Sequence, residues 1–310
     1  MEQFLNPIEG RDRYSLNIDH TATTSDMEQA LAWEGIAAIE MPLSAADFER
    51  FSEGYAVCIE ECPELLVETA HRVDNRFGNE VGHVSKERKI NERTGLQISD
   101  AKNYFHFNEL ARTRWQEQFA KGPKVLRDFL ANGYEIQDAL VSVAKQSIGQ
   151  LDATHPNISQ LYFSDAAGQP TSHSFLRLLR YDGYLVSDNL GEVAKPHYDI
   201  GGVTLQAYAS AEGFWGAAGG VHGERTHYDT KEHEAYLFLG KGHEKMYGSF
   251  DTLKPLWHGV DRIIPAKAAY IPERTAVILF VNAPAIDYHV RATDTVPYIL
   301  GEQALATIDY

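Results

Sequence analysis

The sequence predicts an α+β fold with N-terminal helices, one long bracing helix and a core of the double-stranded β-helix (jelly-roll) type. The first observation is a change of pattern along the chain. Apolar residues recur at helical spacing up to about residue 160, and short β-type runs separated by Gly, Pro and Asp follow from Phe163. The second observation is that residues suited to bind one metal ion are far apart in the sequence. A jelly roll brings distant strands together at one end of the barrel, so it can place such residues side by side.

Two stretches of the first part have the pattern of helices. Ser44 precedes Ala-Ala-Asp and suits the N-cap of a helix that runs through about Ala70, with a break or kink at Pro63. Apolar residues recur at helical spacing from Val125 to Leu151, which predicts a helix long enough to brace a sheet.

The predicted strands of the second part are short and apolar. They cover Ser174 to Tyr181, Thr204 to Ala209, Ala235 to Leu239 and Thr275 to Val281. We expect one domain over residues 1–310. Its parts are a mainly helical segment at about 1–160, the jelly-roll core at about 161–285 and a C-terminal tail or lid at 286–310.

Composition excludes several classes of protein. The chain has 310 residues, 44% of them hydrophobic, and a formal net charge of −16, which argues against nonspecific binding of nucleic acid. No apolar stretch reaches the length of a membrane span, and the first residues lack the basic and apolar segments of a signal peptide. We therefore expect a cytoplasmic protein without a membrane partner, in which Cys58 and Cys62 are reduced thiols.

His197, Asp199 and His258 form a candidate iron site. Residues i and i+2 of an extended segment point the same way, so His197 and Asp199 can hold one metal ion together. His258 lies 61 residues later in an extended, apolar run. Two imidazoles and one carboxylate can bind one face of Fe(II) and leave the opposite face open for other ligands.

Arg274 begins a run of residues that is apolar on both faces and is therefore predicted to be a buried strand. A guanidinium that points into a core is costly unless an anion neutralises it, and its planar fork suits a carboxylate. No acidic residue follows on this strand. The sequence therefore predicts that a ligand from solution supplies the carboxylate.

The chain resembles the isopenicillin N synthase-like family of Fe(II)/2-oxoglutarate-dependent dioxygenases, in segments that span roughly residues 10 to 285. The strings HYDIGGVTL at 197–205, LWHGV at 256–260 and ERTAVILFVN at 273–282 are similar to that family's H-T-D-x-G-x-x-T-L, L-x-H-R-V and R-x-S blocks. FLRLLRY at 175–181 is similar to its strand with a Tyr that helps to hold 2-oxoglutarate. ALAWEGIAAI at 30–39 and SDAKNYF at 99–105 are similar to weaker N-terminal motifs.

The resemblance implies a catalytic centre in which His197, Asp199 and His258 bind Fe(II). It also implies that Arg274 forms a salt bridge with the distal carboxylate of 2-oxoglutarate and that Tyr181 donates a hydrogen bond to it.

Two residues depart from the family pattern. The Ser expected two positions after Arg274 is Ala276, so one hydroxyl contact to 2-oxoglutarate is missing. Thr275 or Tyr181 is the candidate to supply a hydroxyl in its place. The residue after the distal His is Gly259 in place of Arg.

By the same resemblance, the expected reaction couples decarboxylation of 2-oxoglutarate by O2, to succinate and CO2, with oxidation of an unactivated C–H bond. Hydroxylation is the default outcome, and desaturation or oxidative ring closure are variants. Two alternatives stay open. One is an iron oxidase of the same fold that does not use 2-oxoglutarate, and the other is a non-catalytic metal-binding or sensing domain.

The expected substrate is a small molecule, such as an amino acid or a carboxylated natural-product intermediate. The basic stretch from Lys86 to Arg93 offers Arg88 and Arg93 as candidate substrate contacts, beside the alternative of a solvated surface with ion pairs. The segment from Gly219 to Ser249 contains four His residues, for which a polar hairpin is favoured over a second metal site.

Overall fold

The computed structural model of the chain describes residues 24–74, 79–86, 89–90, 97–99, 102–164, 173–181, 183–185, 193–247, 252–261, 270–271 and 273–282. The predicted tail or lid at 286–310 and the candidate substrate contacts Arg88 and Arg93 lie outside these residues.

The helices are concentrated before residue 164. They are α1 (Thr24–Trp33), α2 (Ala45–Glu61), α3 (Pro63–Thr69), α4 (Glu109–Gln118), α5 (Lys124–Gly149), the 3-10 helix η2 (Gln150–Ala153), α6 (Ile158–Phe163), the 3-10 helix η4 (Gly220–His222) and α7 (Lys241–Tyr247). The strands are distributed along the chain. They are β1 (Ile36–Glu40), β2 (His71–Asp74), β3 (Asn79–Lys86), β4 (Lys89–Ile90), β5 (Gln97–Ser99), β6 (Lys102–Asn108), β7 (His173–Tyr181), β8 (Tyr184–Leu185), β9 (Ala194–His197), β10 (Val203–Ala209), β11 (Phe214–Ala217), β12 (Thr226–His227), β13 (Glu234–Leu239), β14 (Trp257–Val260), β15 (Tyr270–Ile271) and β16 (Arg274–Asn282).

Two antiparallel sheets organise these strands. The larger sheet has eight strands in the order β1-β13-β10-β16-β7-β6-β3-β2, and the smaller sheet has the order β12-β11-β14-β9. From β7 onward the chain alternates between them: β7, β10, β13 and β16 lie in the larger sheet, and β9, β11, β12 and β14 lie in the smaller one. Residues far apart in the sequence therefore meet between the two sheets.

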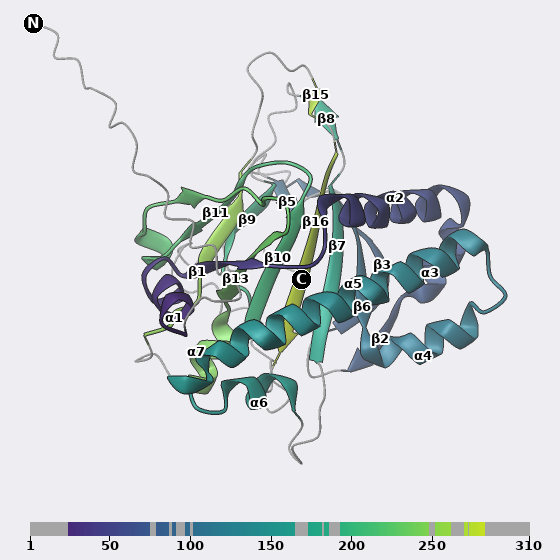
Figure 1. Ribbon diagram of the computed structural model, residues 1–310. Helices are drawn as coiled ribbons and strands as arrows, with labels where there is room; N and C mark the ends of the chain where they lie inside the picture. Colours follow the sequence, from purple (N-terminus) through teal and green to yellow (C-terminus); the bar gives the residue numbers. More distant parts are fainter. Residues whose placement is uncertain are drawn as a thin grey trace, which may run out of the picture.

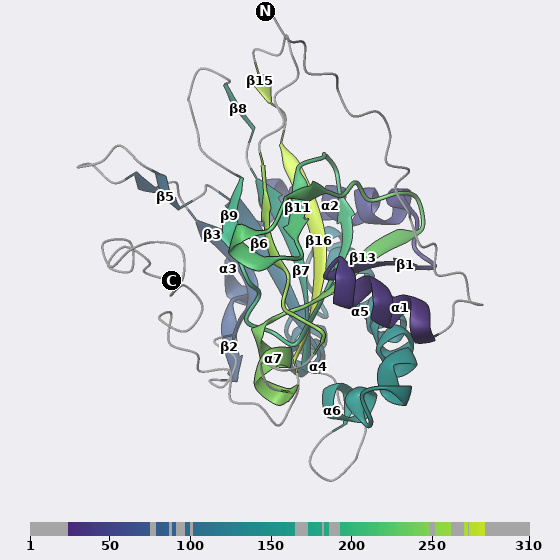
Figure 2. The same ribbon diagram turned by 90° about the vertical axis from the view of Figure 1, so that its left-hand side faces the viewer.

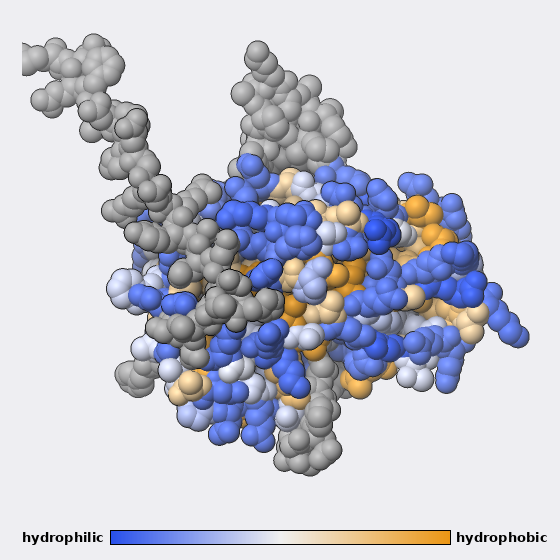
Figure 3. Space-filling view, in the orientation of Figure 1, coloured by the Kyte–Doolittle hydropathy of each residue, from blue (hydrophilic) through white to orange (hydrophobic). Residues whose placement is uncertain are grey.

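The layers are visible in two views. Helix α5 crosses the strands of the larger sheet in Figure 1, and its apolar side packs with residues of β7, β10 and β16 in the main hydrophobic core. In Figure 2 the smaller sheet lies on the side of β16 opposite to α5. Phe214 of β11 stacks on Phe238 of β13 with ring centroids 5.8 Å apart, so the two sheets also pack on one another. The outer surface on the α5 side is mainly hydrophilic (Figure 3).

The helices expected from the sequence are confirmed. Ser44 and Asp47 form a reciprocal capping box at the start of α2, which satisfies backbone N–H groups that the first turn leaves unpaired. Helix α2 ends at Glu61 and α3 begins at Pro63, because proline cannot continue the hydrogen-bond pattern of a helix. No helix in the described ranges has both the length and the apolar character that crossing a bilayer requires.

The mixed helix and strand character predicted from the sequence is also confirmed. The first part contains more strand than its helical pattern suggested, because β1, β2, β3 and β6 supply four of the eight strands of the larger sheet. The four predicted strands of the second part correspond to β7, β10, β13 and β16.

Candidate metal centre

Neighbouring strands of the smaller sheet bring the two candidate imidazole ligands together. His197 ends β9 and lies directly opposite His258 of β14 in the antiparallel pairing. Side chains of directly opposed residues lie on the same face of a sheet. Their ring centroids are accordingly 4.4 Å apart, so the 61-residue separation in sequence becomes a contact.

The backbone of Asp199 is held by the start of α7. The Lys241 N–H donates to the Asp199 carbonyl at 2.7 Å. A Cβ atom on Gly240 would lie 2.2 Å from the Gly201 carbonyl oxygen and 2.8 Å from that of Asp199. Glycine is therefore required at position 240 for the close approach of two backbone segments, which fixes where the carboxylate lies.

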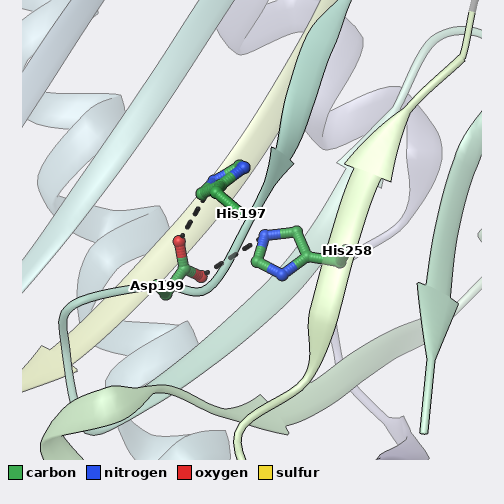
Figure 4. Close-up of side chains that lie close together, drawn as sticks. All are labelled: His197, Asp199 and His258. Carbon is green, nitrogen blue, oxygen red and sulfur yellow. Dashed lines mark ion pairs between the residues drawn. The ribbon is translucent and has the colours of Figure 1, made fainter. Parts of the chain in front are cut away.

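The three side chains converge on one point (Figure 4). His197 Nε2 lies 3.5 Å from Asp199 Oδ1, and His258 Nε2 lies 3.8 Å from Asp199 Oδ2. One ligand atom from each residue falls within 4.8 Å of the others. Among the residues that the structure describes, this is the one cluster of His, Cys, Asp or Glu side chains with such geometry.

Backbone carbonyls set the tautomers of both imidazoles. His197 Nδ1 lies 2.7 Å from the Lys195 carbonyl oxygen, and His258 Nδ1 lies 3.1 Å from that of Leu256. A carbonyl only accepts, so each Nδ1 carries the proton, and in the neutral ring the Nε2 lone pair is directed toward Asp199. Metal-binding histidines have this arrangement.

The electrostatics of the cluster favour metal binding. Burial alone raises the pKa of a carboxyl group, but His258, His197 and the Thr204 hydroxyl hold the pKa of Asp199 well below its usual range. Burial lowers the pKa of His258 to about 4, against the opposing effect of Asp199. A carboxylate and a neutral imidazole are the forms that coordinate a metal.

The site is closed on one side and open on the other. The side chains of Asp199 and His258 keep only 11% and 8% of their surface exposed, whereas that of His197 keeps 48%. The rings of Phe214 and Phe238 cover His258, with centroids 5.9 and 4.8 Å from that of the imidazole. The exposed side of the cluster is therefore the His197 side.

Arg274 is buried, as the sequence predicts. It is 7% exposed at the start of β16, and burial lowers its pKa. Its Nε donates to the Ala211 carbonyl at 3.3 Å. No carboxylate in the described ranges forms an ion pair with it.

The other two predicted cosubstrate contacts, Tyr181 and Thr275, project from opposite faces of the larger sheet. Tyr181 lies directly opposite Arg274 in the pairing of β7 with β16, so the two side chains share a face. Thr275 follows Arg274, so its side chain projects from the other face, while its N–H donates to Ser210 Oγ at 2.9 Å. Ala276 lies on the Arg274 face, in an apolar cluster with Tyr181.

Three residues of this region were not assigned roles from the sequence. Thr204 donates to Asp199 Oδ2 at 2.6 Å, and Arg177 donates to His106 Nε2 at 2.5 Å. The period of a strand could have placed Arg177 with Tyr181, four residues later on the same face. Nothing in the sequence pairs His106 with Arg177, because strand register joins residues 71 positions apart.

The histidines of the segment 219–249 lie elsewhere. His227 pairs with Asp261 at 3.1 Å, and His243 stacks on Tyr247 with ring centroids 4.8 Å apart. Within the described residues these histidines do not form a second metal cluster.

The chain matches no protein-family model and no curated protein, but its structure is similar to solved structures that include oxygenases. The dioxygenase for auxin oxidation 1 of Arabidopsis thaliana, as its 2-oxoglutarate complex, gives a TM-score of 0.60 at 15% identity, over 87% of this chain and 93% of that chain. A 2OG-Fe(II) oxygenase family protein of Caulobacter crescentus gives 0.62 at 14%, over 89% and 88%. A full-length Neurospora crassa protein in complex with alpha-KG gives 0.64 at 16%, over 87% and 84%. At these identities the likeness establishes a shared fold.

Proposed function

We propose that this chain is a non-haem iron dioxygenase that uses 2-oxoglutarate to oxidise a C–H bond of a small metabolite. The main support is the convergence of His197, Asp199 and His258, with both Nε2 atoms directed at the carboxylate. The buried Arg274, with no carboxylate partner among the described residues, supports the cosubstrate.

The topology fits this proposal. We interpret β7, β9, β10, β11, β12, β13, β14 and β16 as a double-stranded β-helix, because the chain passes alternately between two facing sheets. The candidate metal ligands lie on β9, on β14 and just after β9, inside this arrangement. The fold shared with the structures that hold alpha-KG or 2-oxoglutarate agrees with this interpretation. The isopenicillin N synthase-like subfamily remains our assignment from the sequence motifs.

The donor set fits iron. His197 and His258 would contribute neutral imidazole nitrogens, and Asp199 a carboxylate oxygen, which together suit Fe(II) with open positions. Bound iron supplies the activation of O2 that C–H oxidation requires. The protein's own residues hold the ligands in place: the Lys195 and Leu256 carbonyls orient the imidazoles, and Thr204 orients the carboxylate.

The binding of 2-oxoglutarate is assigned to Arg274 and Tyr181. The guanidinium of Arg274 would hold the distal carboxylate, since a buried cation gains most from an anionic partner. Tyr181 lies beside it on the neighbouring strand. Thr275 projects from the other face, so Tyr181 is the better candidate to replace the missing serine hydroxyl.

The surroundings of Ala276 support the alternative function, an iron oxidase that does not use 2-oxoglutarate. Ala276 packs against Tyr104, Leu179 and Tyr181, and this apolar surface replaces the expected hydroxyl contact. In an oxidase of this fold, Arg274 would bind a carboxylate of the substrate.

Titration of the Fe(II) protein with 2-oxoglutarate under argon, followed by O2 uptake and succinate release, tests the proposal. We expect a visible charge-transfer band that saturates with 2-oxoglutarate, and succinate formed in step with O2 consumed. O2 uptake without succinate would support the oxidase. Iron binding with neither band nor O2 uptake would support a non-catalytic metal-binding domain.

A further inference from the structure

The face of the larger sheet that is directed at the metal cluster can be identified from hydrogen bonding and register. Thr204 of β10 donates to Asp199, so its side of the sheet faces the cluster. Gln206 follows two residues later, hence on the same side. Gln206 lies opposite Ile278, Ile278 opposite Arg177, and Arg177 opposite His106. Directly opposed residues share a face, so Arg177 and His106 also face the cluster.

Arg177 is enclosed by groups that do not neutralise it. Its guanidinium carbon lies 4.7 Å from the ring centroid of Phe280 and 5.6 Å from that of Tyr104. Its Nε donates to His106 Nε2 at 2.5 Å, which requires a neutral His106 with the proton on Nδ1. Arg177 forms no ion pair with a carboxylate in the described part of the chain.

The contacts of Arg177 leave its outer edge available. A guanidinium has five N–H donors, and the bond to His106 uses the one on Nε. The four N–H groups on the two Nη atoms form no hydrogen bond to a described residue. Two parallel N–H groups are the geometry that a carboxylate accepts in bidentate fashion.

The local electrostatics favour an anion near this edge. Burial lowers the pKa of Arg177, while the charge of Asp199 acts in the opposite direction. The aromatic rings offset only part of the cost of desolvating a cation. Asp199 accepts a hydrogen bond from Thr204 and forms no ion pair with Arg177 among the described residues, so it does not compensate Arg177 fully.

We infer that Arg177, oriented by His106, binds a carboxylate of the substrate that is oxidised, and that the substrate is therefore a small carboxylic acid. This inference rests on the proposed function and adds the class of substrate to it. Arg274 is four residues from Ile278, which lies opposite Arg177, and four residues span about 13 Å along a strand. Two carboxylates, one from the cosubstrate and one from the substrate, therefore have separate binding positions.

Thermal unfolding with simple carboxylates tests this inference. The Fe(II) protein, saturated with 2-oxoglutarate under argon, is unfolded with formate, acetate or benzoate, and in parallel with formamide, acetamide or benzamide. The three carboxylates differ in size, so that at least one should fit whether the binding position is narrow or wide. Each amide is an uncharged analogue of similar size and therefore isolates the effect of the charge. A ligand that binds only the folded state raises the Tm in a concentration-dependent way.

Two variants make the test specific. Arg177→Leu removes the guanidinium, and Arg180→Leu is the control on the same strand, since Arg180 projects from the other face and pairs with Glu273 at 2.6 Å. We expect a carboxylate to raise the Tm more than its amide in the wild type and in Arg180→Leu. In Arg177→Leu this difference should vanish while the response to 2-oxoglutarate remains. If Arg177→Leu does not fold, Arg177→Lys should bind the carboxylate at least about tenfold more weakly.

Three results would overturn the inference. They are an equal response to carboxylate and amide in the wild type, an undiminished carboxylate response in Arg177→Leu, and loss of the 2-oxoglutarate response in Arg177→Leu. The last would make Arg177 the cosubstrate anchor. A wild type that does not respond to 2-oxoglutarate would contradict the proposed function alone, because the carboxylate and amide series, repeated without iron and 2-oxoglutarate, still tests Arg177.

Discussion

Thr204 Oγ1 donates a hydrogen bond of 2.6 Å to Asp199 Oδ2, so one carboxylate oxygen is oriented by the protein itself. Replacing Thr204 with Val keeps the shape and removes the hydroxyl. We predict that Thr204→Val weakens Fe(II) binding by about 10- to 100-fold, the usual effect of losing a residue that orients a metal ligand. Thr204→Ser should bind iron nearly as well as the wild type. Equal iron affinity in the Val and Ser variants would show that the hydrogen bond does not matter.

Loss of a ligand should be more severe. We predict that His258→Ala abolishes stoichiometric iron binding and turnover, because two protein donors hold Fe(II) poorly. His227→Ala is the matched control, since His227 also lies in the smaller sheet but pairs with Asp261. Metal analysis after gel filtration measures the difference. Full iron content in His258→Ala would remove the central assignment.

Arg274 should control 2-oxoglutarate affinity without affecting iron. Arg274→Lys keeps the charge but loses the planar fork, so we predict that Kd for 2-oxoglutarate rises by about tenfold or more while iron content is unchanged. Titration of the charge-transfer band of the iron chelate gives both quantities. The control is Arg180→Lys, whose side chain projects from the opposite face of the neighbouring strand and pairs with Glu273. An unchanged titration curve in Arg274→Lys would place the anchor elsewhere.

The sequence predicted those parts of the structure that depend on local pattern. The capping box at Ser44 and the strand that begins at Arg274 follow from neighbouring residues. The convergence of His197 and His258 was predicted from the chemistry of their side chains. By contrast, the joining of Arg177 to His106 depends on the register between β6 and β7, and short-range periodicity contains no information on register. Two of the early strands were missed for the same reason, because β1 and β6 pair with strands distant in sequence, β13 and β7.

Gly133 and Gly149 of α5 provide a paired test of the packing of this helix on the larger sheet. A Cβ atom on Gly133 would lie 2.2 Å from the ring of Phe107, whereas one on Gly149 would meet nothing within 4 Å. We predict that Gly133→Ala lowers the free energy of unfolding by about 1–3 kcal/mol through overpacking. Gly149→Ala should raise it by about 0.5–1 kcal/mol, because alanine favours the helix. Denaturant unfolding measures both, and a stabilised Gly133→Ala protein would contradict the packing described for α5.

Ala276 and Tyr181 together test how the cosubstrate carboxylate is bound. We predict that Ala276→Ser tightens 2-oxoglutarate binding, because Ala276 lies on the Arg274 face of β16 and a hydroxyl there can donate to a carboxylate. Tyr181→Phe should weaken binding if the phenol supplies that contact. A hydrogen bond to a charged group contributes about 1.5–3 kcal/mol, equivalent to about 10- to 150-fold in Kd.

The two variants are informative as a pair in the same charge-transfer titration. Weaker binding in Tyr181→Phe with no gain in Ala276→Ser would mean that Tyr181 has taken over the role of the missing serine. If both variants bind 2-oxoglutarate as the wild type does, and the iron protein releases no succinate, the oxidase is the better assignment. Arg274 would then hold a carboxylate of the substrate, and it would compete with Arg177 for the same chemical group.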